Sequence, residues 1–245
     1  MRPASILACA LCAVLGVFSY FCGAALVSFA FVKWQFRNSP EIWIVPKPML
    51  ADVSTDRTGP EVAYFGYEFE SPAPDVKEER KFESAVVLSF SDCAGMSIIK
   101  PGPSGDLIEA MQQEASKRGR NIQDVFGRDA TRSSYAIKSK TLNLTPNDLH
   151  LFSSPREIVG NADLLIIKHT ESKRFKNGLY SFATPWMRGF QEGDVQKDRG
   201  VVIEAFDHYD RRLMLIVGAK PGRTCFAQAD LSHIIFSLRP VPANE

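Results

Sequence analysis

The four histidines are the first residues to consider for chemistry, because imidazole acts as a metal ligand and as a general base near neutral pH. They are widely separated and show no paired spacing such as H-x-x-x-H: His150, His169, His208 and His233. Asp207, His208 and Asp210 place three potential ligands together in a predicted hairpin turn. Polar turns of this kind are usually solvated, so we predict no metal site.

Ser104 and Cys93 are the candidate nucleophiles. The segment Gly102-Pro-Ser104-Gly105 departs from G-x-S-x-G because a glycine follows the serine directly, and Ser104 precedes a predicted helix that it could cap. Cys93 has no base near it in the sequence, and a disulfide between Cys93 and Cys225 stays open, since it depends on the compartment.

A phosphate-binding loop is disfavoured at residues 218–224. This segment is one residue shorter than G-x-x-x-x-G-K-[ST] and has Arg223 where the lysine should stand. We therefore assign no catalytic, cofactor-binding or metal-binding residues and predict no cofactor. The alternative is a hydrolase whose site residues meet only in the folded chain.

Charge is distributed unevenly along the chain. Residues 61–83 contain seven acidic and three basic side chains, whereas residues 117–140 contain seven basic and two acidic ones. The basic segment could contact anionic lipid or an acidic protein, or the two segments could face each other or simply be solvated. Nucleic acid is not expected as a partner, because acidic and basic residues balance after residue 32.

The N-terminal segment predicts a membrane anchor. The chain has 245 residues, 45% of them hydrophobic and 23% charged, which excludes a disordered or disulfide-dense protein. Residues 3–32 contain no charge, and about 20 apolar residues suffice to span a bilayer, so we predict a transmembrane helix over 4–32. Trp34, Phe36 and Trp43 would form an interfacial aromatic belt.

Two properties of this segment stay open. A signal peptide cleaved after Ala30 would release a secreted module, although its apolar run is longer than such peptides need. The flanking charges, Arg2 against Lys33, Arg37 and Lys47, are nearly balanced, and we expect an uncleaved signal anchor with the domain outside the cytoplasm. Small residues in the span would permit a homo-oligomer, which also stays open.

The rest of the chain predicts a linker over 33–60 and a mainly antiparallel α+β domain with packed helices over 61–240. Alternating apolar and polar residues predict strands at 67–70, 85–90, 96–99, 179–186, 201–206 and 212–217. Caps and one-sided apolar spacing predict helices at 106–119, 122–127, 155–169 and 231–238, with a further helix starting at 145–148. Tyr180, Phe182 and Trp186 are expected on one face of the sheet.

The order of these elements resembles the Mog1/PsbP-like α/β/α sandwich. The resemblance rests on the opening strand Gly66-Tyr-Glu-Phe-Glu-Ser-Pro72, the two strands between Val86 and Ile99, and the final helix Leu231–Leu238. It would cover residues 64–239. Within them, residues 128–178 form a helical segment that is longer than the family pattern requires. The resemblance implies a binding or assembly module rather than an enzyme, and it transfers no functional residue.

Overall fold

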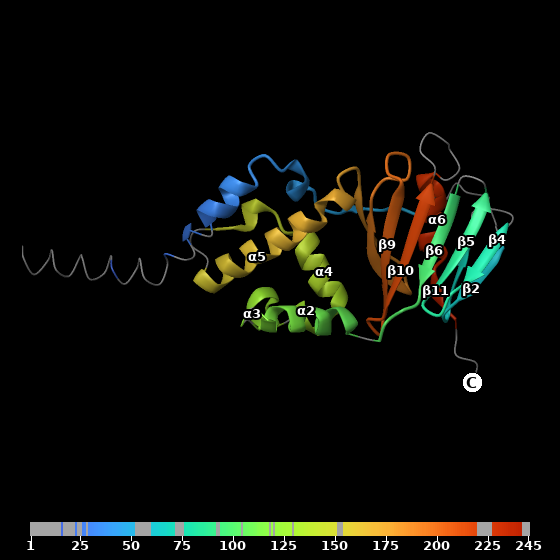
Figure 1. Ribbon diagram of the computed structural model, residues 1–245, viewed down its shortest axis with the longest axis horizontal. Helices are drawn as coiled ribbons and strands as arrows, with labels where there is room; N and C mark the ends of the chain where they lie inside the picture. The colour runs from blue at the N-terminus through green and yellow to red at the C-terminus, as the bar shows by residue number, and fades with distance from the viewer. Residues whose placement is uncertain are drawn as a thin grey trace, which may run out of the picture.

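The protein is an α+β fold of three layers, which confirms the predicted fold class (Figure 1). The computed structural model describes residues 29–51, 60–71, 76–91, 94–103, 105–150, 154–219 and 227–241, apart from 118, 120 and 129, and a few separate positions between 16 and 27. Among these residues, none of the helices combines the length and apolar character needed to span a bilayer. Most of the predicted span over 4–32 lies outside the described residues.

The middle layer is an eight-stranded sheet with the order β1-β7-β8-β9-β10-β6-β5-β4. Only the outer pair of β1 and β7 is parallel within this sheet, so the predicted antiparallel character is confirmed. The strands are β1 (Lys47–Pro48), β4 (Glu78–Lys81), β5 (Ala85–Ser91), β6 (Ala94–Ile99), β7 (Leu179–Ala183), β8 (Met187–Glu192), β9 (Gly200–Asp207) and β10 (Arg212–Ala219).

The expected single strand over 179–186 is wrong at its end. The chain leaves the sheet after Ala183, and the Thr184 hydroxyl accepts a hydrogen bond of 2.9 Å from the backbone N–H of Met187. This tight turn returns the chain as β8, and it places Trp186 at the turn with 56% of its surface exposed. Trp186 therefore does not share a sheet face with Phe182, which is buried.

One face of the large sheet packs on a small sheet and a helix. The small sheet has the order β11-β3-β2, and its elements and the helix are β2 (Glu61–Tyr64), β3 (Tyr67–Glu70), β11 (Arg239–Pro240) and α6 (Gln228–Ser237). Tyr67 and Phe69 are buried and alternate with partly exposed glutamates, as predicted. Leu231, Ile234 and Ile235 of α6 join them against the sheet, so burial of apolar surface holds these layers together.

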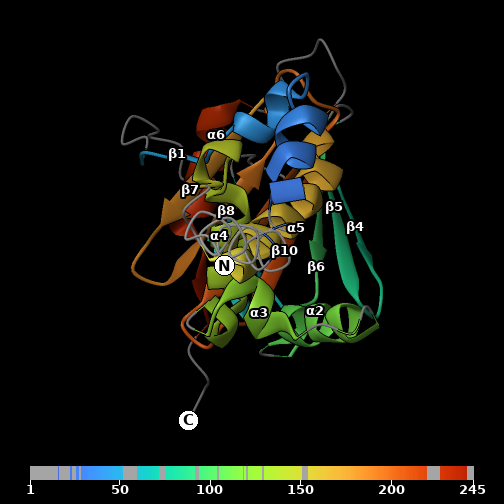
Figure 2. The same cartoon turned by 90° about the vertical axis from the view of Figure 1, so that its left-hand side faces the viewer.

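The other side carries a helical layer (Figure 2). Its elements are α2 (Asp106–Lys117), α3 (Ile122–Phe126), η2 (Ala130–Arg132), α4 (Ser134–Asn143), η3 (Pro146–Asp148), α5 (Pro155–Glu171) and η4 (Ser172–Arg174). The predicted N-caps are confirmed at Asn121 and Ser154, whose side chains accept hydrogen bonds from the N–H groups of Gln123 and Glu157. At 145–148, in contrast, the chain makes only the single turn η3.

Gly160 lies inside α5 because another helix approaches it closely. A Cβ atom there would lie 3.1 Å from the carbonyl oxygen of Val125 in α3, tighter than an ordinary contact. A glycine costs about 1 kcal/mol of helix propensity relative to alanine. The close approach of α3 explains why a glycine stands at this position despite that cost.

Residues 33–48 pack into the fold instead of forming the expected linker. A helix that reaches Gln35 places Val32 in the helical core, and Phe36 and Ile42 are buried beside it. Next, η1 (Pro40–Trp43) makes a turn, and β1 pairs with β7. Phe36 is only 1% exposed and cannot join an aromatic belt, whereas Trp34 is 63% exposed.

The close approach of β8 to β9 gives a first prediction. A Cβ atom on Gly189 would overlap the carbonyl oxygen of Glu204 and contact the ring of Phe182. We expect Gly189→Ala to lower the free energy of unfolding by about 1–3 kcal/mol, because the packed strands must move apart. Urea denaturation of the full-length chain in mild detergent measures this change.

Gly200→Ala in β9 is the matched control. The nearest atom to a Cβ there is 3.7 Å away, an ordinary contact. Equal stability of the two variants would contradict the proposed steric role of Gly189.

Candidate functional site

Helix α4 is fixed at its first turn by the β9–β10 hairpin. Asp210 adopts a positive φ of 61°, and its carboxylate accepts hydrogen bonds from the Ser133 hydroxyl at 2.7 Å and the Ser134 N–H at 2.5 Å. A carboxylate at a helix N-terminus accepts hydrogen bonds from N–H groups that have no partner within the helix. Its negative charge also interacts favourably with the helix dipole. The hairpin therefore sets the position of α4 over the sheet.

Tyr135 fixes the same helix from one side. Its ring stacks on Phe190 of β8 at a centroid distance of 5.4 Å and meets the edge of Phe206 of β9 at 5.8 Å. The guanidinium of Arg188 lies 4.3 Å from the ring centroid of Tyr135, within the range of a cation–π contact. These contacts orient the next turn of α4 toward the sheet.

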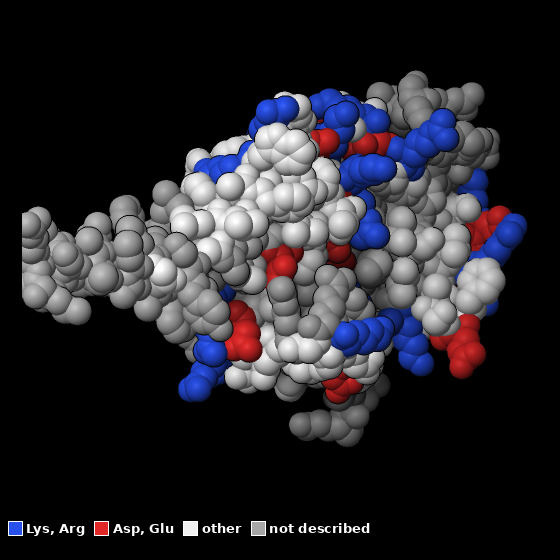
Figure 3. Space-filling view, turned by 60° about the vertical axis from the view of Figure 1, so that its left-hand side comes forward, with Lys and Arg blue, Asp and Glu red and all other residues white. Residues whose placement is uncertain are grey.

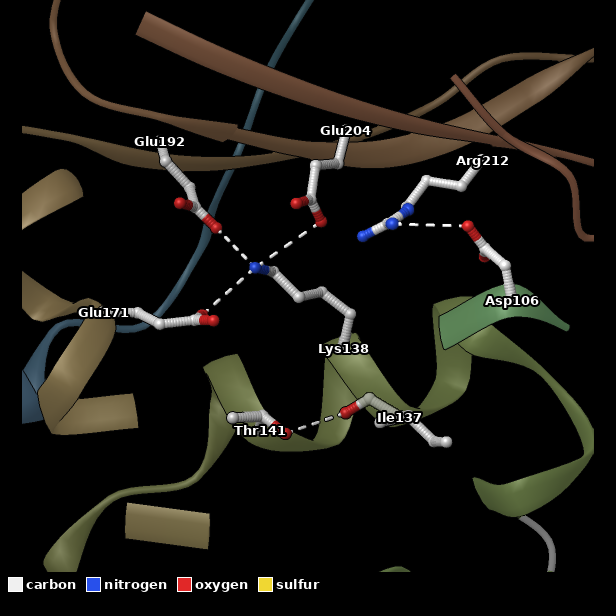
Figure 4. Close-up of polar contacts among 8 residues, drawn as sticks. All are labelled: Asp106, Ile137, Lys138, Thr141, Glu171, Glu192, Glu204 and Arg212. Atoms are coloured by element: carbon white, nitrogen blue, oxygen red, sulfur yellow. Dashed lines mark hydrogen bonds and ion pairs between the residues drawn. The ribbon is translucent and has the colours of Figure 1, made fainter. Parts of the chain in front are cut away.

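That turn buries Lys138 among three glutamates (Figure 4). Its ammonium lies 2.7 Å from Glu192 of β8, 3.2 Å from Glu171 of α5 and 3.5 Å from Glu204 of β9. The side chain of Glu192 has no exposed surface, and that of Glu204 is 5% exposed. One cation from α4 thus joins a second helix to two neighbouring strands.

The charges in this cluster do not balance. Burial alone would lower the pKa of Lys138, but the charges of Glu204, Glu192 and Glu171 raise it above its ordinary value, so the ammonium stays charged. Burial raises the pKa of Glu192 above its usual range, although Lys138 opposes this change. Oε2 of Glu192 and Oε2 of Glu204 accept no hydrogen bond within the described part of the chain. Three carboxylates therefore share one ammonium.

A cavity of about 160 Å³ adjoins this cluster. Figure 3 shows acidic side chains in the hollow between the helical layer and the sheet, with basic side chains around it. Its lining combines charges of both signs and the hydroxyl-bearing Thr141 with apolar groups: Lys138, Glu171, Arg174, Glu204 and Arg212, together with Leu107, Met111, Ile137, Ile167 and Met214. A concave apolar site with a few convergent polar groups is the usual form of a small-ligand site.

Two larger hollows are weaker candidates for a ligand site. One, of about 400 Å³ between α2 and α3, contains a single charged residue, Glu109, among glutamines and apolar side chains. The other, of about 320 Å³, lies beside Trp186, Arg188 and His208 at the strand turns. Its Asp207 is committed to other bonds, described below. We therefore take the cavity beside Lys138 as the candidate site.

Asp207 and Asp210, two of the potential metal ligands in the sequence, have structural roles instead. The buried Asp207 carboxylate accepts hydrogen bonds from the Tyr67 hydroxyl at 2.9 Å and from Arg211 Nε at 2.7 Å. Burial would raise the pKa of Asp207, but the bonds from Arg211 and Tyr67 hold it below its usual range. Asp210 binds the start of α4, and the ring of His208 lies against Tyr209. No group of three potential ligands converges on one point within the described residues.

Most other candidates from the sequence lie apart from the cavity or outside the described residues. Ser104, Cys93, Cys225 and residues 220–224 belong to the undescribed part. His169 packs on Phe36 with ring centroids 4.9 Å apart, and His233 lies 2.9 Å from Glu70. None of the four histidines lines the cavity.

A second buried lysine, Lys168 of α5, shows the opposite electrostatic behaviour. Its ammonium donates a 2.7 Å hydrogen bond to the carbonyl oxygen of Leu144 at the end of α4. Burial lowers the pKa of Lys168 to about 8, against the weaker opposing effect of Asp148. Glutamates keep Lys138 charged, whereas the hydrogen-bond partner of Lys168 within the described residues is a carbonyl oxygen.

The comparisons give no relative from which a function could be transferred. No protein-family model, no curated protein and no solved structure matches the chain. The resemblance to the Mog1/PsbP-like sandwich therefore stays a prediction, and the site must be interpreted from its own geometry.

Removal of the Lys138 charge gives a second prediction. We expect Lys138→Met to lower the free energy of unfolding by about 3–5 kcal/mol, because it leaves buried carboxylates without their cation. Urea denaturation of the full-length chain at pH 7 provides the measurement. Lys197→Met is the control, since the exposed Lys197 forms a surface ion pair with the partly exposed Asp194, for which about 0–1 kcal/mol is expected. A loss below about 1 kcal/mol for Lys138→Met would show that the cluster does not stabilise the fold.

The lowered pKa of Lys168 gives a third prediction. Between about pH 8 and its ordinary pKa of 10.5, the unfolded chain binds a proton at Lys168 that the folded chain lacks. The free energy of unfolding should therefore rise with pH in this window by about 1–3 kcal/mol relative to Lys168→Met. Urea denaturation from pH 7.5 to pH 10 measures the difference, with Lys197→Met as the control. Parallel pH profiles for the wild type and Lys168→Met would contradict the lowered pKa.

Proposed function

We propose that this protein is a single-pass membrane-anchored binding module whose α+β domain lies outside the cytoplasm. The observation that carries the binding function is the cavity beside Lys138, which combines apolar walls with the buried carboxylate of Glu204, whose Oε2 accepts no hydrogen bond from the described residues. Buried polar groups without hydrogen bonds are costly in a folded protein. A bound ligand would reduce this cost by supplying the missing donors.

The anchor is supported by the sequence before the domain. Residues 3–32 contain no charge, and this apolar segment is long enough to cross a bilayer as a helix. Phe31, near the end of this segment, and Trp34 and Trp43, which follow it, have exposed side chains. Tryptophan is enriched at the membrane–water interface, where its ring is partly apolar and its N–H meets water.

The junction between the segment and the domain is short. Val32 has no exposed surface, and Phe36 lies in the same helical core, so the chain enters the fold at the end of the uncharged segment. A membrane helix over 4–32 would then hold the helical layer next to the bilayer. The domain would be presented in a restricted orientation instead of moving on a long tether.

A fractionation experiment tests the anchor. We expect the full-length chain to stay with membranes after an alkaline carbonate wash, and protease added outside spheroplasts of a bacterial host to digest the domain. In Val17→Arg/Phe21→Arg, two charges near the middle of the uncharged segment should cause release, since each costs about 2.5–3.5 kcal/mol at a helix centre. Lys33→Ala/Arg37→Ala is a control that leaves this segment uncharged.

Three results would contradict parts of this proposal. Recovery of the wild type in the soluble fraction would reject the anchor. A mature chain that starts at Phe31 would show a cleaved signal peptide. Protection of the domain from external protease in intact spheroplasts, with digestion after lysis, would place it in the cytoplasm.

A further inference from the structure

The inner end of the cavity carries negative charge without enough cations. Glu204 is 4% exposed and borders the cavity, and its Oε2 accepts no hydrogen bond from any described residue. Its ion-pair partner Lys138 lies at 3.5 Å and is shared with Glu171 and Glu192. An ammonium group of a ligand could donate hydrogen bonds here and supply the missing positive charge.

The outer part of the cavity carries guanidinium groups. Arg212 of β10 is one-quarter exposed, and its ion pair with Asp106, at 3.3 Å, leaves further N–H donors for other contacts. Arg174 is exposed, lines the same cavity and forms no ion pair within the described residues. Guanidinium groups bind carboxylates in a planar, often bidentate geometry. The mouth is therefore suited to a small carboxylate.

The strand register fixes the separation of these two charges. Glu204 of β9 pairs directly with Met214 of β10, and Arg212 lies two residues before Met214. Arg212 and Glu204 are thus diagonal neighbours on one face of the sheet, a relation that corresponds to about 7–8 Å between backbones. A molecule of a few atoms is sufficient to bridge the two side chains.

The remaining walls and the volume restrict the ligand further. Leu107 and Met111 of α2, Ile167 of α5 and Met214 of β10 make an apolar lining between the charged groups. A cavity of about 150 Å³ holds a molecule the size of benzene, so the 160 Å³ here suits a ligand of similar size. The site combines an acidic end, a basic end and an aliphatic wall.

We propose that this cavity binds a small zwitterion, an amino acid with a short aliphatic side chain. Its ammonium would lie against Glu204 and Glu171, its carboxylate against Arg212 and Arg174, and its side chain against Met111 and Met214. This inference rests on the proposed binding function and names the ligand class of the same cavity.

Calorimetric titration with three matched probes tests the ligand class. L-valine carries both charges, isobutylamine is valine without the carboxylate, and isovalerate is valine without the ammonium. We expect the full-length protein in mild detergent to bind L-valine, and each single-charge probe to bind about tenfold more weakly or worse, because one set of charge-assisted hydrogen bonds is lost.

Two variants connect the binding to the cavity. Glu204→Gln and Arg212→Gln should each weaken L-valine binding about tenfold or more, and either one suffices if the other fails to fold. Glu78→Gln and Arg80→Gln are the matched controls, because these residues form an exposed ion pair on β4. Both controls should bind L-valine as the wild type does.

Several results would overturn the proposal. They are absence of L-valine binding, equal binding of either single-charge probe, or unchanged binding in both cavity variants that fold. Binding of isobutylamine alone would reject the zwitterion yet keep a binding module, which separates the two proposals. The measurement does not depend on the membrane, so a failure of the anchor in fractionation leaves its outcome unaffected.

Discussion

The arrangement of the helical layer on the sheet depends on one buried ammonium shared by three carboxylates. Lys138 extends from α4 to Glu192 and Glu204 on adjacent strands and to Glu171 at the end of α5. Displacement of α4 would leave the glutamates of β8 and β9 buried without a cation, an arrangement that is strongly unfavourable. The cluster therefore fixes the register between two layers, and this register determines the shape of the adjoining cavity.

Other interactions hold α4 so that the cluster can form. Asp210 binds its first turn, Tyr135 stacks on the sheet, and Leu142 is fully buried with Phe175 and Phe190. These contacts differ in kind, since they are a charge-assisted cap, an aromatic stack and an apolar core. Together they keep a lysine in a position where its desolvation is compensated, and they support one wall of a cavity that the sheet alone could not make.

The sequence allowed much of the fold to be predicted but almost none of the site. Alternation identified β5, β9 and β10, because each has at least one regular apolar face. It failed for α4, where lysines, serines and a tyrosine form no apolar stripe, so only a polar, basic segment was visible. The partners of Lys138 are 33 to 66 residues away on other elements, and no local pattern connects them. Residues 33–48 were predicted as a linker because of their prolines. Prolines indicate a loop, but they do not show that Phe36 and Ile42 are buried in the fold.

A double-mutant cycle between Lys138 and Glu192 tests the central claim most directly. The free energies of unfolding of the wild type, Lys138→Met, Glu192→Gln and the double variant give the coupling between the two side chains. If this glutamate holds the buried ammonium, the coupling should be at least about 1 kcal/mol. The double variant should then lose less stability than the sum of the losses of the two single variants. Additive losses, within about 0.5 kcal/mol, would contradict the claim that this ion pair joins α4 to the sheet.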